Sequence, residues 1–165
     1  RDPEMSRGLG DVYKRQDRYA AECALCDIDF CFDIKENNLR NLDYFDIVTV
    51  LNNLLDNAVE ASKKASSRHV SIATSYRNNF SIIVITNSCA APPEFSSSGE
   101  LKTTKENSKL HGFGLKSVKN ALKKYDGDIS LEYSQEKGEF IATVMLDSRI
   151  TPDSPSGSQP APEKR

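Results

Sequence analysis

The sequence of 165 residues lacks several features that would point at once to a broad class of protein. Its formal net charge is only -2, so no overall field draws it to nucleic acid or to an anionic membrane. No apolar run approaches the roughly 20 residues that a membrane-spanning helix needs. No internal repeat is visible. These absences favour one globular domain, and a hydrophobic content of 38% is enough to build its core.

Cysteine is present, but not in a metal-binding pattern. Cys23 and Cys26 have the spacing C-x-x-C, yet no second pair and no nearby histidine completes a zinc site with them. Cys31 and Cys89 stand alone. We interpret all four as reduced thiols in a reducing compartment.

Both ends of the chain have unusual composition. Met5 resembles an original start, RDPE before it resembles a vector-derived scar, and SRGLGDVYKRQ resembles a translated sequencing adapter. We therefore expect residues 1–16 to lie outside the fold as a disordered tail. The end of the chain, TPDSPSGSQPAPEKR, is rich in proline, serine and charge, so residues 149–165 are also expected to be disordered. The predicted domain spans residues 17–148.

The periodicity of the apolar residues predicts the elements of this domain. DIDFCFDI (27–34) alternates as a strand does, and residues 44–64 carry apolar side chains at helical spacing (47, 51, 54, 55 and 58), with Asp43 as the expected N-cap. Residues 69–77 and 80–88 are predicted strands of a hairpin that turns at Asn78–Asn79. Residues 89–111 have little periodicity and predict a long loop, typical of a lid.

A second helix is predicted over 113–125, with Gly127 ending it, and a last hairpin joins 128–134 to 139–146. Hairpin-linked strands and two helices predict the α+β class. We expect a two-layer α/β sandwich whose mixed, largely antiparallel sheet carries its helices on one face.

Two polar features stand out against this frame. Asn53, Asn57, Glu60 and Lys64 share one face of the first helix. This is either an ordinary solvated face, or the short amide oxygens of its asparagines are ligands for a hard cation such as Mg²⁺. Asparagine is a poor residue inside a helix, so two of them one turn apart call for a reason, and both interpretations stay open at this point. The sequence HGFGLKSVK has two glycines one residue apart at the start of the second helix; alone, it indicates a tight turn and no more.

Taken together, these motifs resemble a known superfamily. LNNLLDNAVEA is similar to the N box of the GHKL, or Bergerat-fold, ATPases and especially of bacterial sensor histidine kinases. IIVITNS stands where the first glycine box of that superfamily begins, and TTKENSKLHGFGLKSVK resembles its lid and second glycine box. The resemblance covers roughly residues 25–147. Its details resemble the quorum-sensing kinases of the accessory-gene-regulator type from Gram-positive bacteria.

The resemblance implies roles for two asparagines on the first helix. Asn57 matches the residue that chelates Mg²⁺, and both Asn53 and Asn57 are expected in the catalytic site. Asn53 stands where the hydrolases of the superfamily carry a glutamate as general base. Because an amide cannot take up a proton there, the resemblance favours phosphoryl transfer over ATP hydrolysis.

The resemblance also implies contacts to ATP. Asn87 stands where most members read adenine with an aspartate, and its carbonyl can accept the same hydrogen bond more weakly. The glycines that usually follow are replaced by Cys89 and by Pro92–Pro93, so the first glycine box is degenerate.

The phosphates of ATP would meet the second glycine box and the lid. Gly112 and Gly114 would offer backbone N–H groups at the start of the helix that Leu115 continues. His111 is either a phosphate contact or a lid or capping residue. Two lid lysines, Lys102 and Lys105, either contact the γ-phosphate when the lid closes or are solvated.

No histidine of the chain fits the role of phosphoacceptor. The only two, His69 and His111, stand at a strand start and in the glycine box. The resemblance therefore implies a catalytic fragment that binds ATP and Mg²⁺ and serves a phosphoacceptor hairpin absent from this chain, for relay to a response regulator. We expect a monomeric cytoplasmic domain, without autophosphorylation by itself, of a kinase anchored in the bacterial membrane. Three alternatives stay open: a hydrolase, a serine kinase of the anti-sigma type, and a nucleotide-free interaction module.

Overall fold

A computed structural model describes residues 3–92 and 111–150, with side chains for residues 10–92 and 114–150. The elements, in chain order, are α1 (Pro3–Leu25), β1 (Asp29–Asp33), the short 3₁₀ helix η1 (Glu36–Asn38), α2 (Tyr44–Ser62), β2 (His69–Arg77), β3 (Phe80–Ser88), α3 (His111–Lys123), β4 (Asp128–Ser134) and β5 (Glu139–Asp147). The predicted elements agree with these bounds to within about two residues. Most of the predicted loop, residues 93–110, lies outside the described residues.

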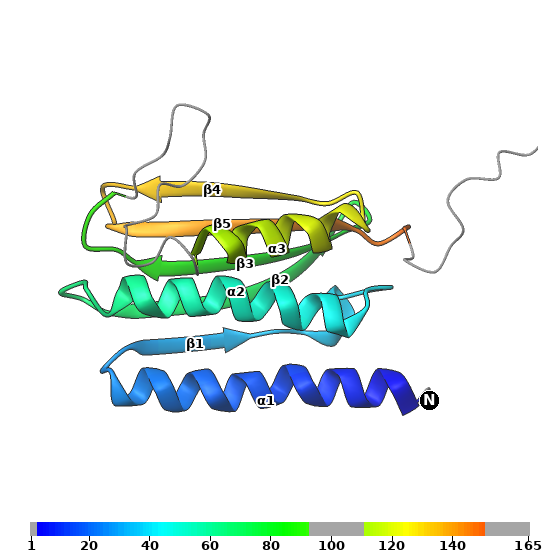
Figure 1. The fold of residues 1–165 in the computed structure, drawn as a ribbon, viewed down its shortest axis with the longest axis horizontal. Helices are drawn as coiled ribbons and strands as arrows, with labels where there is room; N and C mark the ends of the chain where they lie inside the picture. The colour runs from blue at the N-terminus through cyan, green and yellow to red at the C-terminus, as the bar shows by residue number, and fades with distance from the viewer. Residues whose placement is uncertain (1–2, 93–110, 151–165) are drawn as a thin grey trace, which may run out of the picture.

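The strands form one five-stranded sheet in the order β1-β2-β3-β5-β4. Only β1 and β2 run parallel, because α2 connects them as a crossover; the other three pairs are antiparallel. Helices α2 and α3 lie side by side over one face of the sheet, and α1 runs along the β1 edge (Figure 1). The predicted fold class, a two-layer sandwich with a mixed and largely antiparallel sheet, is confirmed.

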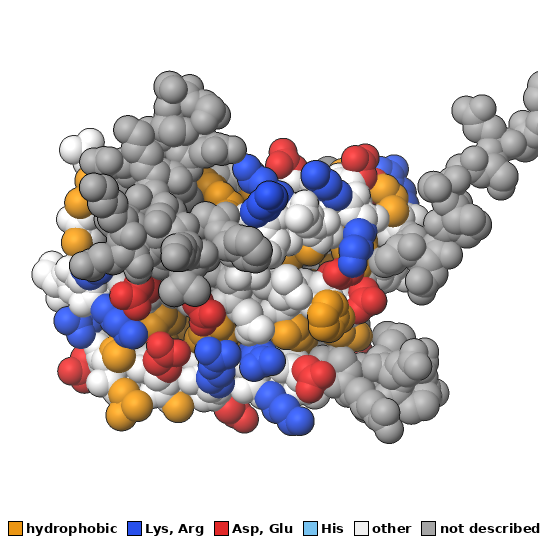
Figure 2. All heavy atoms as spheres, in the orientation of Figure 1, with side chains coloured by type: hydrophobic (Ala, Val, Ile, Leu, Met, Phe, Trp, Pro, Cys, Tyr) orange, Lys and Arg blue, Asp and Glu red, His pale blue; other side chains and the backbone are white. Residues whose placement is uncertain are grey.

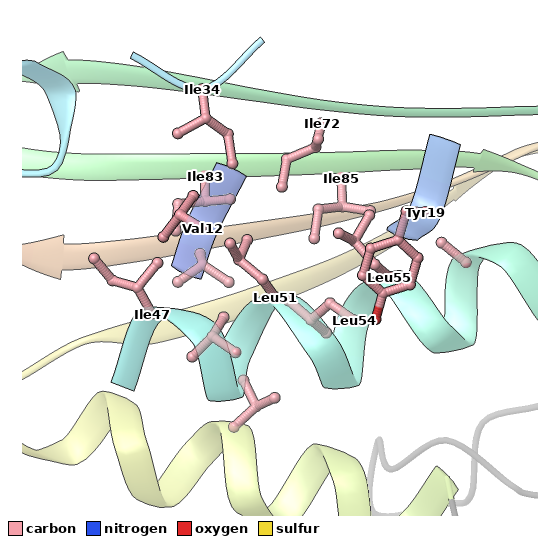
Figure 3. Close-up of a cluster of buried hydrophobic side chains, with 14 of the residues drawn as sticks. Val12, Tyr19, Ile34, Ile47, Leu51, Leu54, Leu55, Ile72, Ile83 and Ile85 are labelled. Carbon is pink, nitrogen blue, oxygen red and sulfur yellow. The ribbon is translucent and has the colours of Figure 1, made fainter. Parts of the chain in front are cut away.

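The core lies between α2 and the sheet, where the apolar stripe of α2 meets β2 and β3 (Figure 3). All five apolar positions predicted on this helix are buried. Ile72, Ile83 and Ile85, each 1% exposed, face them from the sheet. On the outer surface of the helical layer, acidic and basic side chains are interspersed (Figure 2).

The local signals at α2 and at the first hairpin are confirmed. The side chain of Asp43 caps α2, with Phe45 N donating to Asp43 Oδ1 at 2.8 Å. Asn78 and Asn79 have φ values of 51° and 67°, the left-handed pair that a tight two-residue hairpin turn needs.

The structure differs from the prediction that residues 1–16 lie outside the fold. Helix α1 includes residues 3–16, and Val12 and Tyr19, two turns apart, are both 0% exposed. The Tyr19 hydroxyl donates to Asp56 Oδ1 at 2.6 Å, and burial, reinforced by this bond, raises the pKa of Tyr19. The physical reason is an apolar stripe on α1 that packs against α2 and β1. At the other end, residues 151–165 lie outside the described residues.

The end of α3 corrects the role given to Gly127. The residue in the left-handed conformation is Asp126, with φ of 49°, whereas Gly127 does not have a positive φ. Glycine is required at 127 for space: a Cβ there would lie 2.6 Å from the carbonyl oxygen of Met145. A close approach of the helix end to β5 therefore selects glycine at this position.

Candidate functional site

A cavity of about 100 Å³ opens between α2, the start of α3 and the sheet. Its polar groups come from two predicted site residues, Asn57 on α2 and Asn87 on β3, and from Cys89 just beyond β3. Leu115, also predicted, contributes from the first turns of α3. The other lining residues are apolar: Leu54, Ala58, Ala61, Ile85, Leu131, Phe140 and Ala142. This is the pattern of a small-molecule site, with apolar walls and a few polar groups.

Asn87 lines the cavity and is 2% exposed. Its Nδ2 donates to the carbonyl oxygen of Ser88 at 2.9 Å. This bond fixes the orientation of the amide and leaves Oδ1 as the atom that can accept a hydrogen bond from a ligand. A base with an exocyclic amino group satisfies that geometry.

Asn53 has a different position from Asn57. It does not line the cavity; its Nδ2 donates to the carbonyl oxygen of Thr49 at 2.8 Å. Its Oδ1 faces α3, because a Cβ added to Gly114 would lie 3.0 Å from that oxygen. Gly114 thus lets α3 approach α2 closely, in addition to any contact with a ligand.

The start of α3 lies at one end of the cavity. His111 and Gly112 are its first two residues, so the glycines lie within the first turn and not before it. The free N–H groups of a helix start and the helix dipole favour a negatively charged ligand, and Leu115 places this end at the cavity. The side chain of His111 and the lid residues Lys102 and Lys105 lie outside the described residues.

The remaining members of the predicted polar stripe, Glu60 and Lys64, do not line the cavity. Glu60 pairs with Lys63 at 3.7 Å, and Lys64 is exposed and does not line the cavity. This placement agrees with a solvated face at these two positions.

The sequence-based reasoning missed the far wall of the cavity. Leu131 on β4 and Phe140 on β5 form it, because they are paired across the sheet with Ala142 and Asn87 respectively. The alternation of the last hairpin predicts that these side chains point inward, but only the strand order shows which cavity they line.

The donor set fits a magnesium ion brought in with a phosphate ligand. Among the described side chains, no group of three or more His, Cys, Asp and Glu residues could hold a metal. Asn57 offers a single amide oxygen at the cavity. Mg²⁺ suits this arrangement, because it commonly takes one or two protein oxygens and completes its shell with water and substrate phosphates.

The fold and this cavity define a class of protein. The GHKL domain family matches residues 42–147, more than half of the chain, and the chain belongs to that family. No curated protein matches the chain.

Solved structures of histidine kinases share the fold. The catalytic domain of the histidine kinase ThkA, in a nucleotide-free form, is 22% identical with a TM-score of 0.63, over 88% of this chain and 94% of that domain. The mycobacterial sensor histidine kinase MprB is 16% identical with a TM-score of 0.58, over 84% of this chain and 93% of that one. A complex of ThkA with the response regulator protein TrrA matches at 18% identity and a TM-score of 0.61, over 89% of this chain and 41% of that one. Within the described ranges, no helix of this chain is both long and apolar enough to cross a membrane.

Proposed function

We propose that this chain is the ATP-binding catalytic domain of a two-component sensor histidine kinase. It donates the γ-phosphate of ATP to a histidine on a dimerisation hairpin that belongs to the same kinase and is not in this sequence. The observation that carries the proposal is the cavity that joins Asn57, Asn87 and the start of α3, in a chain with the GHKL fold.

Each part of ATP has a counterpart at the cavity. The adenine amino group donates to Asn87 Oδ1, whose orientation the Ser88 carbonyl fixes, and the base lies against Ile85 and Phe140. The phosphates extend toward the N–H groups of α3 around Gly112 and Gly114. Lys102, Lys105 and His111 complete the phosphate contacts in this proposal.

Asn57 would hold the Mg²⁺ that accompanies the nucleotide. The ion supplies charge neutralisation at the phosphates when it is bound. Asn57 itself orients the phosphates by its fixed place on α2, one turn beyond Asn53.

Asn53 favours transfer to a protein over hydrolysis. Its amide has no basic nitrogen or carboxylate, its Nδ2 donates to Thr49 O, and its Oδ1 lies close to Gly114. A water molecule near this side chain would therefore lack a general base. Phosphoryl transfer to a positioned nucleophile depends mainly on positioning and charge neutralisation, which this site can supply.

The finer assignment is to the quorum-sensing kinases of the accessory-gene-regulator type. This assignment is supported by the residue sequences of two motifs, NLLDNAVEA and HGFGLKSVK, and by the degenerate first glycine box. In this proposal the full-length kinase is bacterial and membrane-anchored, this domain is cytoplasmic and monomeric in isolation, and an aspartate of a response regulator receives the phosphate. The complex of ThkA with TrrA is a precedent for such a partner in the same fold.

Calorimetric titration with Mg·ATP tests the proposal. We expect weak binding that Asn57→Ala reduces at least tenfold, about 1.4 kcal/mol. Asn120→Ala is the matched control, because Asn120 is exposed on α3 and does not line the cavity. Binding of ATP by the unmodified domain should also weaken when EDTA removes Mg²⁺. Asn87→Ala, in contrast, should weaken the binding of Mg·ATP even at saturating Mg²⁺. Absence of millimolar binding by the unmodified domain would refute the proposal.

The competing functions predict different outcomes. A hydrolase would release phosphate steadily from Mg·ATP, and Asn53→Ala would abolish that release. A serine kinase would place acid-stable phosphate on a partner protein without the hairpin, whereas a phosphohistidine is acid-labile. We expect neither activity from the domain alone.

A further inference from the structure

The C-x-x-C pair spans the end of α1: Cys23 lies in its last turn, and Cys26 directly follows its last residue, where the chain turns toward β1. Cys26 N donates to the carbonyl oxygens of Glu22 and Cys23, both at 3.2 Å, and Ile28 N donates to Cys23 O at 2.9 Å. Asp27, which stands between Cys26 and Ile28, has a φ of 53°. These bonds form a Schellman motif, which ends the helix in a fixed geometry with Cys23 and Cys26 one tight turn apart.

The two thiols lie on the same, inner side of this turn. Cys23 is 0% exposed within the core, and Cys26 is partly buried against that core. Their mutual influence agrees with this: burial raises the pKa of the Cys23 thiol to about 11, and the nearby charges of Glu22 and of the Cys26 thiolate add to the rise.

A cation lies beside the more accessible thiol. Lys63 bonds Glu22 at 3.5 Å across the α1–α2 contact. Desolvation lowers the pKa of Lys63, but Glu60, the Cys26 thiolate and Glu22 outweigh it, and the net shift is upward. Lys63 therefore lies near Cys26, which is the thiol of the pair that a small oxidant can reach.

We propose that Cys23 and Cys26 form a redox-modifiable dithiol, which a low-molecular-weight disulfide converts into an intramolecular disulfide at the end of α1. The Cys26 thiolate attacks one sulfur of the oxidant and releases the first thiolate. Cys23 then loses its proton to solvent, attacks the Cys26 sulfur of the mixed disulfide, and releases the second. Two protein thiols are oxidised and one small disulfide is reduced to two thiols.

The backbone allows this closure with a small movement. Residues three apart on a helix have Cβ atoms about 5–6 Å apart, and a disulfide needs about 3.5–4.5 Å. The bond from Cys26 N to Cys23 O is of the 3₁₀ type, in which side chains at i and i+3 eclipse, so the turn is already tightened in the required direction. Closure would restrain the junction between α1 and β1, and it depends neither on ATP nor on the proposed kinase function.

The same two cysteines are less suited to binding a metal ion. Among the described side chains there is no third His, Cys, Asp or Glu placed to complete a metal-binding group with these thiols. A dithiol without further ligands suits two-point capture by a trivalent arsenical, which provides a direct probe of the pair.

The test uses the full chain with Cys31→Ser and Cys89→Ser, which removes the other two thiols. Folded protein is incubated with glutathione disulfide, alkylated, and analysed by peptide mass spectrometry. We expect a Cys23–Cys26 disulfide that glutathione reverses. With Cys23→Ser the reaction should stop as one glutathione adduct on Cys26, and with Cys26→Ser no disulfide should form.

Phenylarsine oxide gives a second readout on the chain that keeps both thiols. We expect one equivalent to bind and to protect both from alkylation, with at least a tenfold loss of affinity in either single variant. The proposal would be overturned if two thiols could still be alkylated after treatment with glutathione disulfide. It would also be overturned if, in the chain with both cysteines, the glutathione adduct on Cys26 never converted into the Cys23–Cys26 disulfide.

Discussion

The contact between Tyr125 and Asp46 gives the sharpest prediction for stability. Tyr125, just beyond α3, is 1% exposed, and its hydroxyl donates to Asp46 Oδ2 at 2.7 Å while accepting from Asp43 N at 3.0 Å. Asp46, in the first turn of α2, is 5% exposed and also accepts from Lys124 Nζ at 2.9 Å. Tyr125→Phe removes one hydroxyl from this cluster and preserves the ring.

The cost follows from what the hydroxyl leaves behind. Asp46 stays in place with only Lys124 as its charged donor, and a hydrogen bond to a charged group contributes about 1.5–3 kcal/mol. Asp43 is exposed, so water can replace the bond to its N–H at little cost. We expect Tyr125→Phe to lower the free energy of unfolding by about 2–3 kcal/mol, which corresponds to a melting temperature roughly 4–12 °C lower.

Urea unfolding followed by circular dichroism measures this change. The midpoint should fall with the m-value unchanged, because the surface exposed on unfolding is the same. Tyr133→Phe is the matched control, since the Tyr133 hydroxyl has no hydrogen bond to any residue that the structure describes. A Tyr125→Phe protein within about 0.5 kcal/mol of the unmodified one would refute the reasoning.

Three further outcomes are expected. Gly114→Ala should not stabilise the protein, although alanine is usually about 1 kcal/mol more favourable than glycine in a helix, because the new Cβ would lie 3.0 Å from Asn53 Oδ1. In an Asn53→Ala background, where that oxygen is absent, urea unfolding should show the stabilisation. Gly127→Ala should cost about 2–3 kcal/mol in thermal unfolding, because its Cβ would meet a backbone carbonyl at 2.6 Å. Arg149 lowers the pKa of Asp147 to about 2 from 3.8. The resulting stability is complete above pH 3.8 and is lost as pH falls toward 2, so the deficit of Arg149→Gln in urea should shrink over that range.

The sequence predicted the elements well wherever the signal was local. The Asp43 cap, the Asn78–Asn79 turn and the stripe of α2 each depend on neighbours in the chain or on one helical period, and each is confirmed. Helix α1 was missed because the interpretation of residues 1–16 came from their resemblance to an adapter. Its burial depends on Tyr19 meeting Asp56, 37 positions away, which no local pattern reveals.

The candidate site was predicted in part. Asn57, Asn87 and Leu115 come together at the cavity, as the motif order implied. The structure adds that Asn53 contacts the start of α3 and that Leu131 and Phe140 form the far wall. These last positions follow from strand order, in which β5 lies between β3 and β4, and strand order is a property of the whole chain.

The parallel pairing of β1 with β2 has a practical consequence for anyone who shortens this protein. The family match begins at residue 42, but β1 occupies Asp29–Asp33 and hydrogen-bonds along His69–Ala73. A fragment cut at residue 42 would leave β2 as a bare sheet edge, beside core side chains such as Val70 and Ile72. Uncovered edges of this kind template strand addition between molecules, so such a fragment should aggregate where the longer chain stays in solution.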